Sequence, residues 1–411
     1  MKTYTPFLLL PFIFLSASCQ KAKFPAEPKP IKVTAKSQQL IRNNNQFGLE
    51  LFQTVLNNED STKNIMISPL SATLALAMTY NGAAGYTKTA FENTFHLNGL
   101  TTEEINQSML DLCDALTSVD KLVDMKIANS IWYRNTFHVE NDFLNANKKY
   151  YHAEVKALNF DDPNSKNVIN NWVDKQTDHK IPSIVDHLSS DDVMVLINAL
   201  YFKGDWKSEF KKADTENKPF YLADGSTVQV PTMHQKTDMG YFNSDLFTAV
   251  ELPYGRGNFS MVLMLPNEGK TIRDLEVAFT QENWQNWMDN LSDPAEMTIN
   301  LPKFKFDYSR PMNEDFTKLG LGNAFSDSAD FSKINPDIPL AISRVKQKTF
   351  IEVNEEGTTA AAVTSVTVGV TSAGPGETIS FNHPFLFAIR EITTGTILFV
   401  GRVMDPRQTG D

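Results

Sequence analysis

The sequence is poor in cysteine, has no excess of basic charge and contains no apolar run long enough to cross a membrane as a helix. Its two cysteines, Cys19 and Cys113, cannot build a disulfide framework, and its seven histidines show no metal-ligand spacing. The 49 acidic residues outnumber the 38 basic ones, which argues against a surface for nucleic acid. We therefore expect no metal, no cofactor and no nucleic-acid partner.

Catalytic motifs are also lacking. The chain contains no G-x-S-x-G nucleophile elbow, no H-E-x-x-H and no G-x-G-x-x-G after a strand. Gly269-Lys270-Thr271 resembles the end of a phosphate-binding loop, but Met264 stands where the first glycine is required. With 41% hydrophobic residues over 411 positions, the chain has ample material for a large packed core. These features predict a folded protein that is not an enzyme.

The first 18 residues have the character of an export signal. Lys2 precedes the apolar run Phe7–Leu15, and small residues follow before Cys19. This arrangement resembles a bacterial lipobox, which implies lipidation of Cys19; an ordinary signal peptide with an incidental cysteine is the alternative. Residues 19–37 are rich in Lys, Pro and Ala and are predicted to form a tether. We expect an exported protein of the bacterial cell envelope, an outer-membrane lipoprotein on the periplasmic or outer surface.

The body, residues 38–411, is predicted to have helices first and strands later. Ser68 and Pro69 are typical of a helix start, and the helix that follows is apolar nearly all round, as expected for a central helix. Further helical patterns cover 38–57, 102–117, 139–150 and 164–177. Apolar runs typical of strands dominate from about residue 193, and Thr394-Gly395 separates two of them as in a hairpin. Segregated helices and strands indicate an α+β fold.

The stretch 357–380 stands out by what it lacks. Its 24 residues carry one charge, Glu377, and contain no aromatic residue and no methionine. A connection of this length is uncommon in a packed domain and is usually functional or disordered. Val366, Val368 and Val370 fall on one face of an extended chain, so the segment could lie exposed as a loop and yet form a good central strand. A flexible linker is the alternative reading.

Six segments, in order, resemble the serpins, the serine protease inhibitors. The resemblance covers about residues 38–408 and implies helices packed around three mainly antiparallel sheets, with an exposed reactive-centre loop at about 355–380. It is carried by NIMISPLSATLALAMTYNGAAG (64–85), NWVDKQTDHKIPSIV (171–185), NALYFKGDWKSEF (198–210), LPKFKF (301–306), FIEVNEEGTTAAA (350–362) and FNHPFLFAIREITTGTILFVGRVMDP (381–406).

The resemblance implies a mechanism and its residues. A protease attacks the loop, and the loop then inserts into the central sheet and traps the acyl-enzyme. Small side chains should face the core at Thr358, Ala360, Ala362, Thr364, Val366 and Val368. The implied hinge is Glu355, Glu356, Gly357, Thr358, Thr359, Ala360, Ala361 and Ala362. The implied sheet-opening region comprises Ser68, Ser71, Asn198, Trp206, Lys303 and Gln347, with an ion pair between Lys303 and Glu355 and with Gln347 where the family often has a His.

The family's spacing places the reactive bond at Thr371–Ser372, and a bond one or two residues to either side is the alternative. The neighbouring side chains are small or β-branched, and a pocket that accepts them is of the elastase type. We therefore expect a monomeric inhibitor of an elastase-like serine protease, with subtilisin-like and cysteine proteases as further candidate targets. We also expect a lipid anchor to attach the protein to the membrane. A non-inhibitory serpin-fold binding protein is the alternative function.

Overall fold

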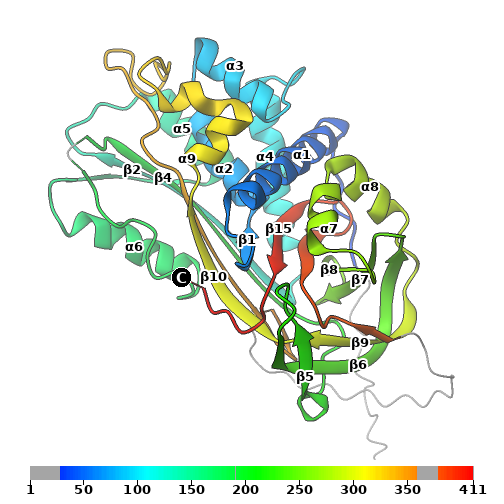
Figure 1. The fold of residues 1–411 in the computed structure, drawn as a ribbon. Coiled ribbons are helices and arrows are strands. Elements are labelled where there is room, and N and C mark those ends of the chain that lie inside the picture. The colour runs from blue at the N-terminus through cyan, green and yellow to red at the C-terminus, as the bar shows by residue number, and fades with distance from the viewer. Residues whose placement is uncertain (1–27, 190, 359–377, 411) are drawn as a thin grey trace, which may run out of the picture.

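The computed structural model describes residues 28–189, 191–358 and 378–410 (Figure 1). Within these ranges the helices gather mainly on one side of the molecule. They are α1 (Ala35–Asn58), α2 (Pro69–Tyr80), α3 (Gly85–Thr94), α4 (Thr102–Ser118), α5 (Asn141–Tyr151), α6 (Ser165–Gln176), α7 (Ile272–Ala278), α8 (Gln281–Asp289) and α9 (Asn313–Phe316), with short helical turns at Lys212–Asp214, Thr317–Leu321 and Gly322–Phe325.

The strands that the described residues form are mostly antiparallel. They are β1 (Ile65–Ile67), β2 (Val123–Arg134), β3 (Glu154–Leu158), β4 (Met194–Asp205), β5 (Glu216–Tyr221), β6 (Thr227–Asn243), β7 (Phe247–Tyr254), β8 (Phe259–Pro266), β9 (Ala295–Pro302), β10 (Phe304–Pro311), β11 (Lys346–Val353), β12 (Gly357–Thr358), β13 (Thr378–Ser380), β14 (Phe385–Glu391) and β15 (Ile397–Val403). Only the β2–β3 and β9–β13 pairs are parallel in the described part of the chain.

The strands make a central sheet and a second, bent arrangement. The central sheet has the order β10-β11-β12-β4-β2-β3. The second has the order β1-β15-β14-β8-β7-β6-β9-β13, with β5 beside β6. Strand β6 is shared, because residues 240–243 pair with β7 and residues 232–239 pair with β9. Counted on either side of β6, the described strands form three sheets, as the resemblance implies.

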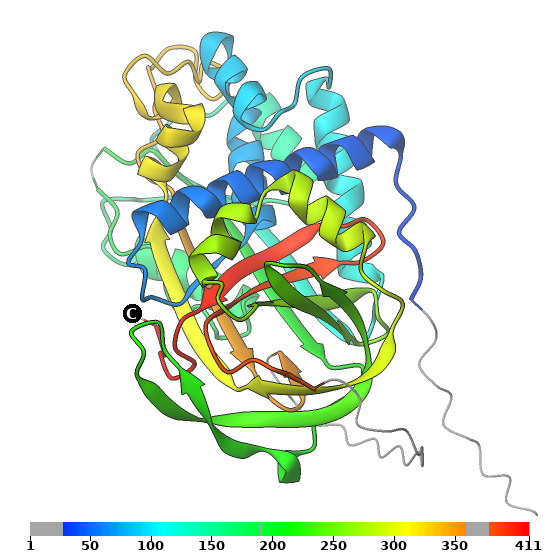
Figure 2. The same ribbon diagram turned by 45° about the vertical axis from the view of Figure 1, so that its right-hand side comes forward.

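Helix α2 lies at the centre of the molecule for reasons present in its sequence. Ser68 caps it by accepting from the amide of Ser71, and Pro69 fills the first helical position, where no amide donor is needed. All but one of its residues are buried. It packs between the central sheet and β15, while α1 lies against β15 and α7 lies against β14 and β8 (Figure 2). On the opposite face of the central sheet, α6 packs over Trp132 and Ile197.

The beginning of the domain differs from the predicted tether. Helix α1 starts at Ala35, three residues before the expected boundary, because the Thr34 hydroxyl accepts from the amide of Ser37. Ahead of it, Ile31 and Val33 pack against the core, and Lys29 exchanges two hydrogen bonds with Asn258. Residues 28–37 are therefore not a free tether. No helix within the described ranges has the length and apolar character needed to cross a membrane.

Candidate functional site

The central sheet contains a strand of only two residues between two long ones. Strand β12 pairs with β11 through Thr358 and Val353, and with β4 through Thr358 and Gly204. Beyond β12, no pairing joins β11 to β4 in the described part of the chain. We call the space between the facing edges of these two long strands the sheet gap. Residues 355–358, which we call the docked hinge, occupy one end of it.

Three hydrogen bonds from the segment after β4 fix the backbone of the docked hinge and of Asn354 just before it. The amide of Trp206 donates to the carbonyl of Glu356 at 2.8 Å, and the amide of Phe210 donates to the carbonyl of Glu355 at 2.9 Å. The indole nitrogen of Trp206 donates to the carbonyl of Asn354 at 2.9 Å. Trp206 also stacks on Tyr254, with ring centroids 4.4 Å apart. The position of Trp206 near the loop entrance thus has a direct structural basis.

Glu355 is the best-anchored side chain of the docked hinge. It is buried, and its carboxylate lies 2.8 Å from Lys303 Nζ and accepts from the Thr215 hydroxyl at 2.9 Å. Burial raises the pKa of Glu355, but the hydrogen bonds from Lys303, from the backbone and from Thr215 outweigh this effect and hold the pKa below its ordinary value. The ion pair that the resemblance implied between Lys303 and Glu355 is present.

Further carboxylates lie around the docked hinge. Glu356 pairs with Lys212 at 2.5 Å. Burial raises the pKa of Asp205, and the negative charge of Glu356 adds to this shift, whereas Lys203 opposes it. The pKa of Glu209 is also raised by burial and by the nearby charges of Asp205 and Glu356. The anchored hinge therefore concentrates negative charge at this end of the gap.

Gly357 and Thr358 lie in the sheet itself, where space is very limited. A Cβ atom on Gly357 would lie 2.2 Å from the carbonyl oxygen of Gly204, so only glycine can occupy this position without displacing β4. Thr358 is 3% exposed, and its hydroxyl lies 2.6 Å from the hydroxyl of Tyr254. The side chain of Thr358 therefore faces the core.

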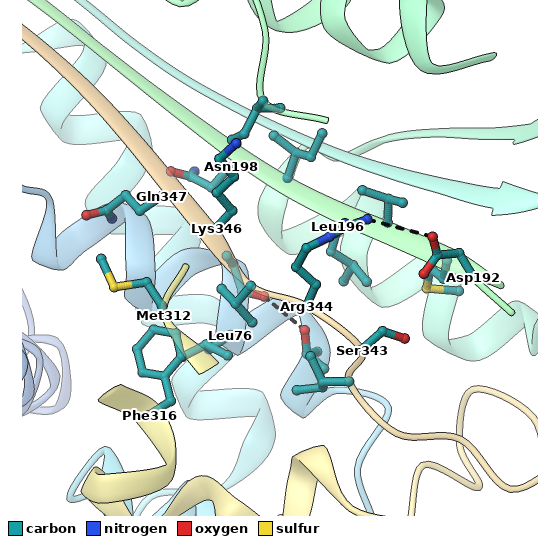
Figure 3. A pocket seen from close by; sticks show the side chains of 18 of the residues that line it. Leu76, Asp192, Leu196, Asn198, Met312, Phe316, Ser343, Arg344, Lys346 and Gln347 are labelled. Atoms are coloured by element: carbon teal, nitrogen blue, oxygen red, sulfur yellow. Dashed lines mark hydrogen bonds and ion pairs between the residues drawn. The ribbon is translucent and has the colours of Figure 1, made fainter. Parts of the chain in front are cut away.

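The part of the sheet gap away from the hinge contains a cavity of about 150 Å³ (Figure 3). Leu196 and Asn198 line it from β4, and Gln347 lines it from β11. Leu76 of α2 and Phe316 form part of its apolar floor. Figure 3 shows the side chains of the two facing strands on either side of this space. An extended segment with small side chains could be accommodated here.

Of the remaining residues of the expected sheet-opening region, Ser71, Asn198 and Gln347 line this cavity and Ser68 lies beside it. Gln347 makes two hydrogen bonds to the backbone of Ser68, accepting from its amide at 3.0 Å and donating to its carbonyl at 2.9 Å. The Ser68 hydroxyl donates to the carbonyl of Leu398 at 2.7 Å. Asn198 donates to Asn129 at 2.8 Å. Gln347 thus bonds to Ser68 but not to Asn198.

The structure separates the expected site residues into two groups. Trp206 and Lys303 contact the docked hinge, to which Glu355 belongs, whereas Ser71, Asn198 and Gln347 line the cavity and Ser68 bonds to Gln347 beside it. The hinge residues Thr359, Ala360, Ala361 and Ala362, the reactive bond Thr371–Ser372, and Cys19 lie outside the described residues.

Sequence reasoning missed Tyr254, Thr215 and Asn129, which contact the docked hinge or Asn198. The described residues hold no group of three or more His, Cys, Asp or Glu side chains that could bind a metal.

Comparisons with known proteins agree with this architecture. Residues 42–406 match the family described as "Serpin (serine protease inhibitor)". The human leukocyte elastase inhibitor is 35% identical over 382 residues, which cover 90% of this chain and 100% of that protein. The native state of tengpin, a thermophilic serpin, has a TM-score of 0.82 and 32% identity, covering 92% of this chain and 97% of that one. Human thyroxine-binding globulin in complex with thyroxine has a TM-score of 0.82 and 28% identity, covering 91% of this chain and 100% of that one.

The chain therefore belongs to the serpin family and has the α+β serpin fold. Serpins are protease inhibitors rather than catalytic enzymes, and the 35% identity to a leukocyte elastase inhibitor supports a protease-inhibitor function for this protein.

Proposed function

We propose that this protein is a suicide-substrate inhibitor of an elastase-like serine protease. The observation that carries the proposal is the sheet gap with a hinge already docked at one end. Strand β12 is paired on both sides, whereas the rest of β4 and β11 face each other without pairing among the described residues. Unpaired strand edges inside a sheet are a strong template for a further strand.

The proposed chemistry begins as ordinary proteolysis. The protease serine attacks the carbonyl carbon of Thr371, the bond to the nitrogen of Ser372 breaks, and an ester joins the protease to Thr371. The loop that carries the ester then enters the sheet gap from the docked hinge onward. Thr371 lies thirteen positions after Thr358, and at about 3.3 Å per residue the tethered protease moves by roughly 40 Å. Trapping requires that this movement be faster than hydrolysis of the ester.

The composition of the loop suits this movement. Residues 359–370 carry no charge and no side chain larger than valine. A buried charge without a partner would cost several kcal/mol, whereas Ala, Thr and Val can enter a confined space between strands. The docked hinge also shortens the search for the correct register, because its pairing with β4 and β11 already exists.

Incubation with pancreatic elastase tests the proposed function. We expect a covalent complex that survives denaturation in SDS, in which the protease is esterified to the chain. Cleavage of the loop without a complex would instead indicate a non-inhibitory binding protein. The similarity to thyroxine-binding globulin supports this second candidate function. Absence of any reaction in the loop would contradict the proposed protease class.

The specificity of the proposed inhibitor depends on the residue before the reactive bond. A narrow apolar pocket accepts Thr371, but a trypsin-like pocket requires Lys or Arg. Thr371→Arg should therefore create inhibition of trypsin and slow inhibition of elastase by at least about tenfold. Sequencing the released C-terminal peptide checks the register directly. A peptide that starts more than two residues from Ser372 would show that the assignment of the reactive bond is wrong.

We further propose that Cys19 carries a lipid that holds the protein in the bacterial envelope, as a lipoprotein exported by residues 1–18. Cys19→Ala should move the protein from the membrane fraction to the soluble fraction without changing inhibition. Cys113→Ala is the matched control, because it removes the other cysteine, which lies buried in the domain. A wild-type protein that is already wholly in the soluble fraction after export would contradict the anchor.

A further inference from the structure

The chain ahead of α1 is held against the domain. Residues 28–34, which we call the N-terminal strap, run along one edge of the molecule toward the end that carries the docked hinge (Figure 2). The backbone of Lys29 exchanges two hydrogen bonds with the Asn258 side chain, at 3.2 Å and 2.7 Å. The amide of Ile31 donates to the Thr393 hydroxyl at 3.0 Å. The path by which the chain enters the domain is therefore fixed.

The N-terminal strap begins beside the turn between β7 and β8. A Cβ atom on Gly257 would lie 3.8 Å from Pro28 Cγ and 3.7 Å from Lys207 Nζ, so both residues flank this turn. Lys207 directly follows Trp206, whose amide donates to the docked hinge and whose indole nitrogen donates to Asn354. The start of the strap and the docked hinge thus lie at the same end of the domain.

Basic side chains gather around this turn and along the strap. We call them the basic surface; they are Lys29, Lys32, Lys121, Lys207 and Arg256. The loop that carries Lys121 packs on the turn, where a Cβ atom on Gly255 would lie 3.1 Å from Val123. The four lysines are exposed, and none of them forms an ion pair within the described part of the chain. Leu122, which is 51% exposed, adds an apolar side chain next to Lys121.

The carboxylates nearest to the basic surface in the sequence are engaged elsewhere. Asp120 is buried and accepts from the amides of Leu122 and Arg256, at 2.9 Å and 2.7 Å. Asp205 and Glu209 belong to the carboxylates that gather around the docked hinge. The basic surface therefore keeps a positive charge, although the whole chain has 49 acidic and 38 basic residues.

The proposed anchor brings this surface to a membrane. Cys19 lies nine positions before Pro28, so the chain between them reaches at most about 30 Å. Each lysine or arginine close to an anionic bilayer strengthens the association about fivefold. This attraction acts over a Debye length of about 10 Å, so the basic surface has to face the bilayer to gain it. The acidic remainder of the domain is repelled by the same headgroups.

We propose that the basic surface rests on the anionic phospholipid headgroups of the membrane that carries the Cys19 lipid, so that the domain is held with its docked hinge toward the bilayer. The inference rests on the proposed anchor, because the position of Cys19 determines which surface lies within reach. This orientation would direct the inhibitor to proteases that act at the membrane surface.

Sedimentation with lipid vesicles tests the basic surface. The protein is full-chain Cys19→Ala from the soluble fraction, and the vesicles contain phosphatidylcholine and phosphatidylglycerol in equal parts. The test variant combines Lys29→Gln, Lys32→Gln and Lys207→Gln. The matched control combines Lys148→Gln, Lys175→Gln and Lys333→Gln, which remove the same charge from exposed lysines outside the basic surface.

We expect the test variant to bind these vesicles about 100-fold more weakly than its Cys19→Ala parent, and the control to bind like the parent. Salt at about 0.5 M should release the parent, because it shortens the Debye length. Vesicles of phosphatidylcholine alone should bind none of the three proteins.

Energy transfer to an acceptor lipid measures the orientation of the anchored protein in the same vesicles. A fluorophore on Ser208→Cys, next to the basic surface, should transfer more efficiently than one on Ile338→Cys. Ile338 is 49% exposed and follows Asn335, which donates to the carbonyl of His138 ahead of α5, at the end of the molecule away from β9 (Figure 1). Cys113 is buried and stays unlabelled.

Equal binding of the test variant and the control would overturn the assignment of the basic surface, and equal energy transfer from the two labels would overturn the orientation. Binding to a sulfated polysaccharide without binding to the vesicles would overturn the lipid as partner. The proposed anchor fails in a different way, because the wild type itself would then be found in the soluble fraction. The failures are therefore distinguishable.

Discussion

Thr358→Arg is expected to convert the protein from an inhibitor of elastase into a substrate of it. Thr358 is 3% exposed, and its hydroxyl lies 2.6 Å from that of Tyr254. An arginine at this position would place a charge without a partner in an apolar layer, at a cost of several kcal/mol. Each 1.4 kcal/mol on the barrier slows insertion tenfold, so we expect slowing by a factor of 100 or more. Hydrolysis of the acyl-enzyme would then be faster than loop insertion, so the protease would be released.

The measurement is the partition between covalent complex and cleaved chain at equal amounts of protein and elastase. Thr359→Arg is the matched control, because side chains alternate along a strand and residue 359 would face the other side of the sheet. The control should retain most of the complex. If both variants formed as much complex as the wild type, the docked hinge would not be the starting point of insertion.

Cleavage of the loop is expected to raise the melting temperature of the protein by more than about 10 °C. The facing edges of β4 and β11 would then gain a strand that pairs on both sides, and the cavity of about 150 Å³ would be filled by Thr364, Val366 and Val368. The intact protein would be held in a less stable state by the tension of the uncut loop, which is kinetic rather than thermodynamic stability. Differential scanning calorimetry of the intact protein and of protein cut in the loop by thermolysin measures the change in melting temperature.

The outcome for Thr358→Arg sharpens this prediction. Cleavage should raise the melting temperature of Thr358→Arg by less than that of the wild type. The reason is that the arginine blocks the first step of loop insertion, whether or not a protease is attached to the loop. If cleavage did not raise the melting temperature of the wild type, filling the sheet gap would release no free energy, and inhibition by trapping would have no driving force.

Much of the fold could be predicted because its signals are local. Ser68 and Pro69 mark the start of α2, and the structure places the cap and the helix there. The hairpin around Thr394 and Gly395 is β14 and β15. Helices α7 and α8 were not predicted, since at 7 and 9 residues they are too short for a clear periodic pattern. The start of α1 was placed late because the cap at Thr34 lies in a segment whose composition suggested a linker.

The candidate site could be predicted only where the family resemblance supplied positions. It placed Lys303 and Glu355 together although they are 52 residues apart in the sequence. It could not supply Tyr254 or Asn129, because these residues reach the site through strand pairing and not through a local motif. Asn198 Oδ1 has no hydrogen-bond donor among the described residues because of how the amides of Asn198 and Asn129 are oriented, and sequence patterns contain no information of that kind.

Amide hydrogen exchange of β4 and β11 before and after loop cleavage tests the central claim most directly. In the intact protein, the amides of these strands that face the sheet gap have no strand partner beyond β12 within the described residues. Loop insertion would pair them, so peptides covering 194–203 and 346–352 should exchange slower by several orders of magnitude after cleavage. Unchanged exchange in both peptides, in protein proven to be cut between Thr371 and Ser372, would contradict insertion into this gap.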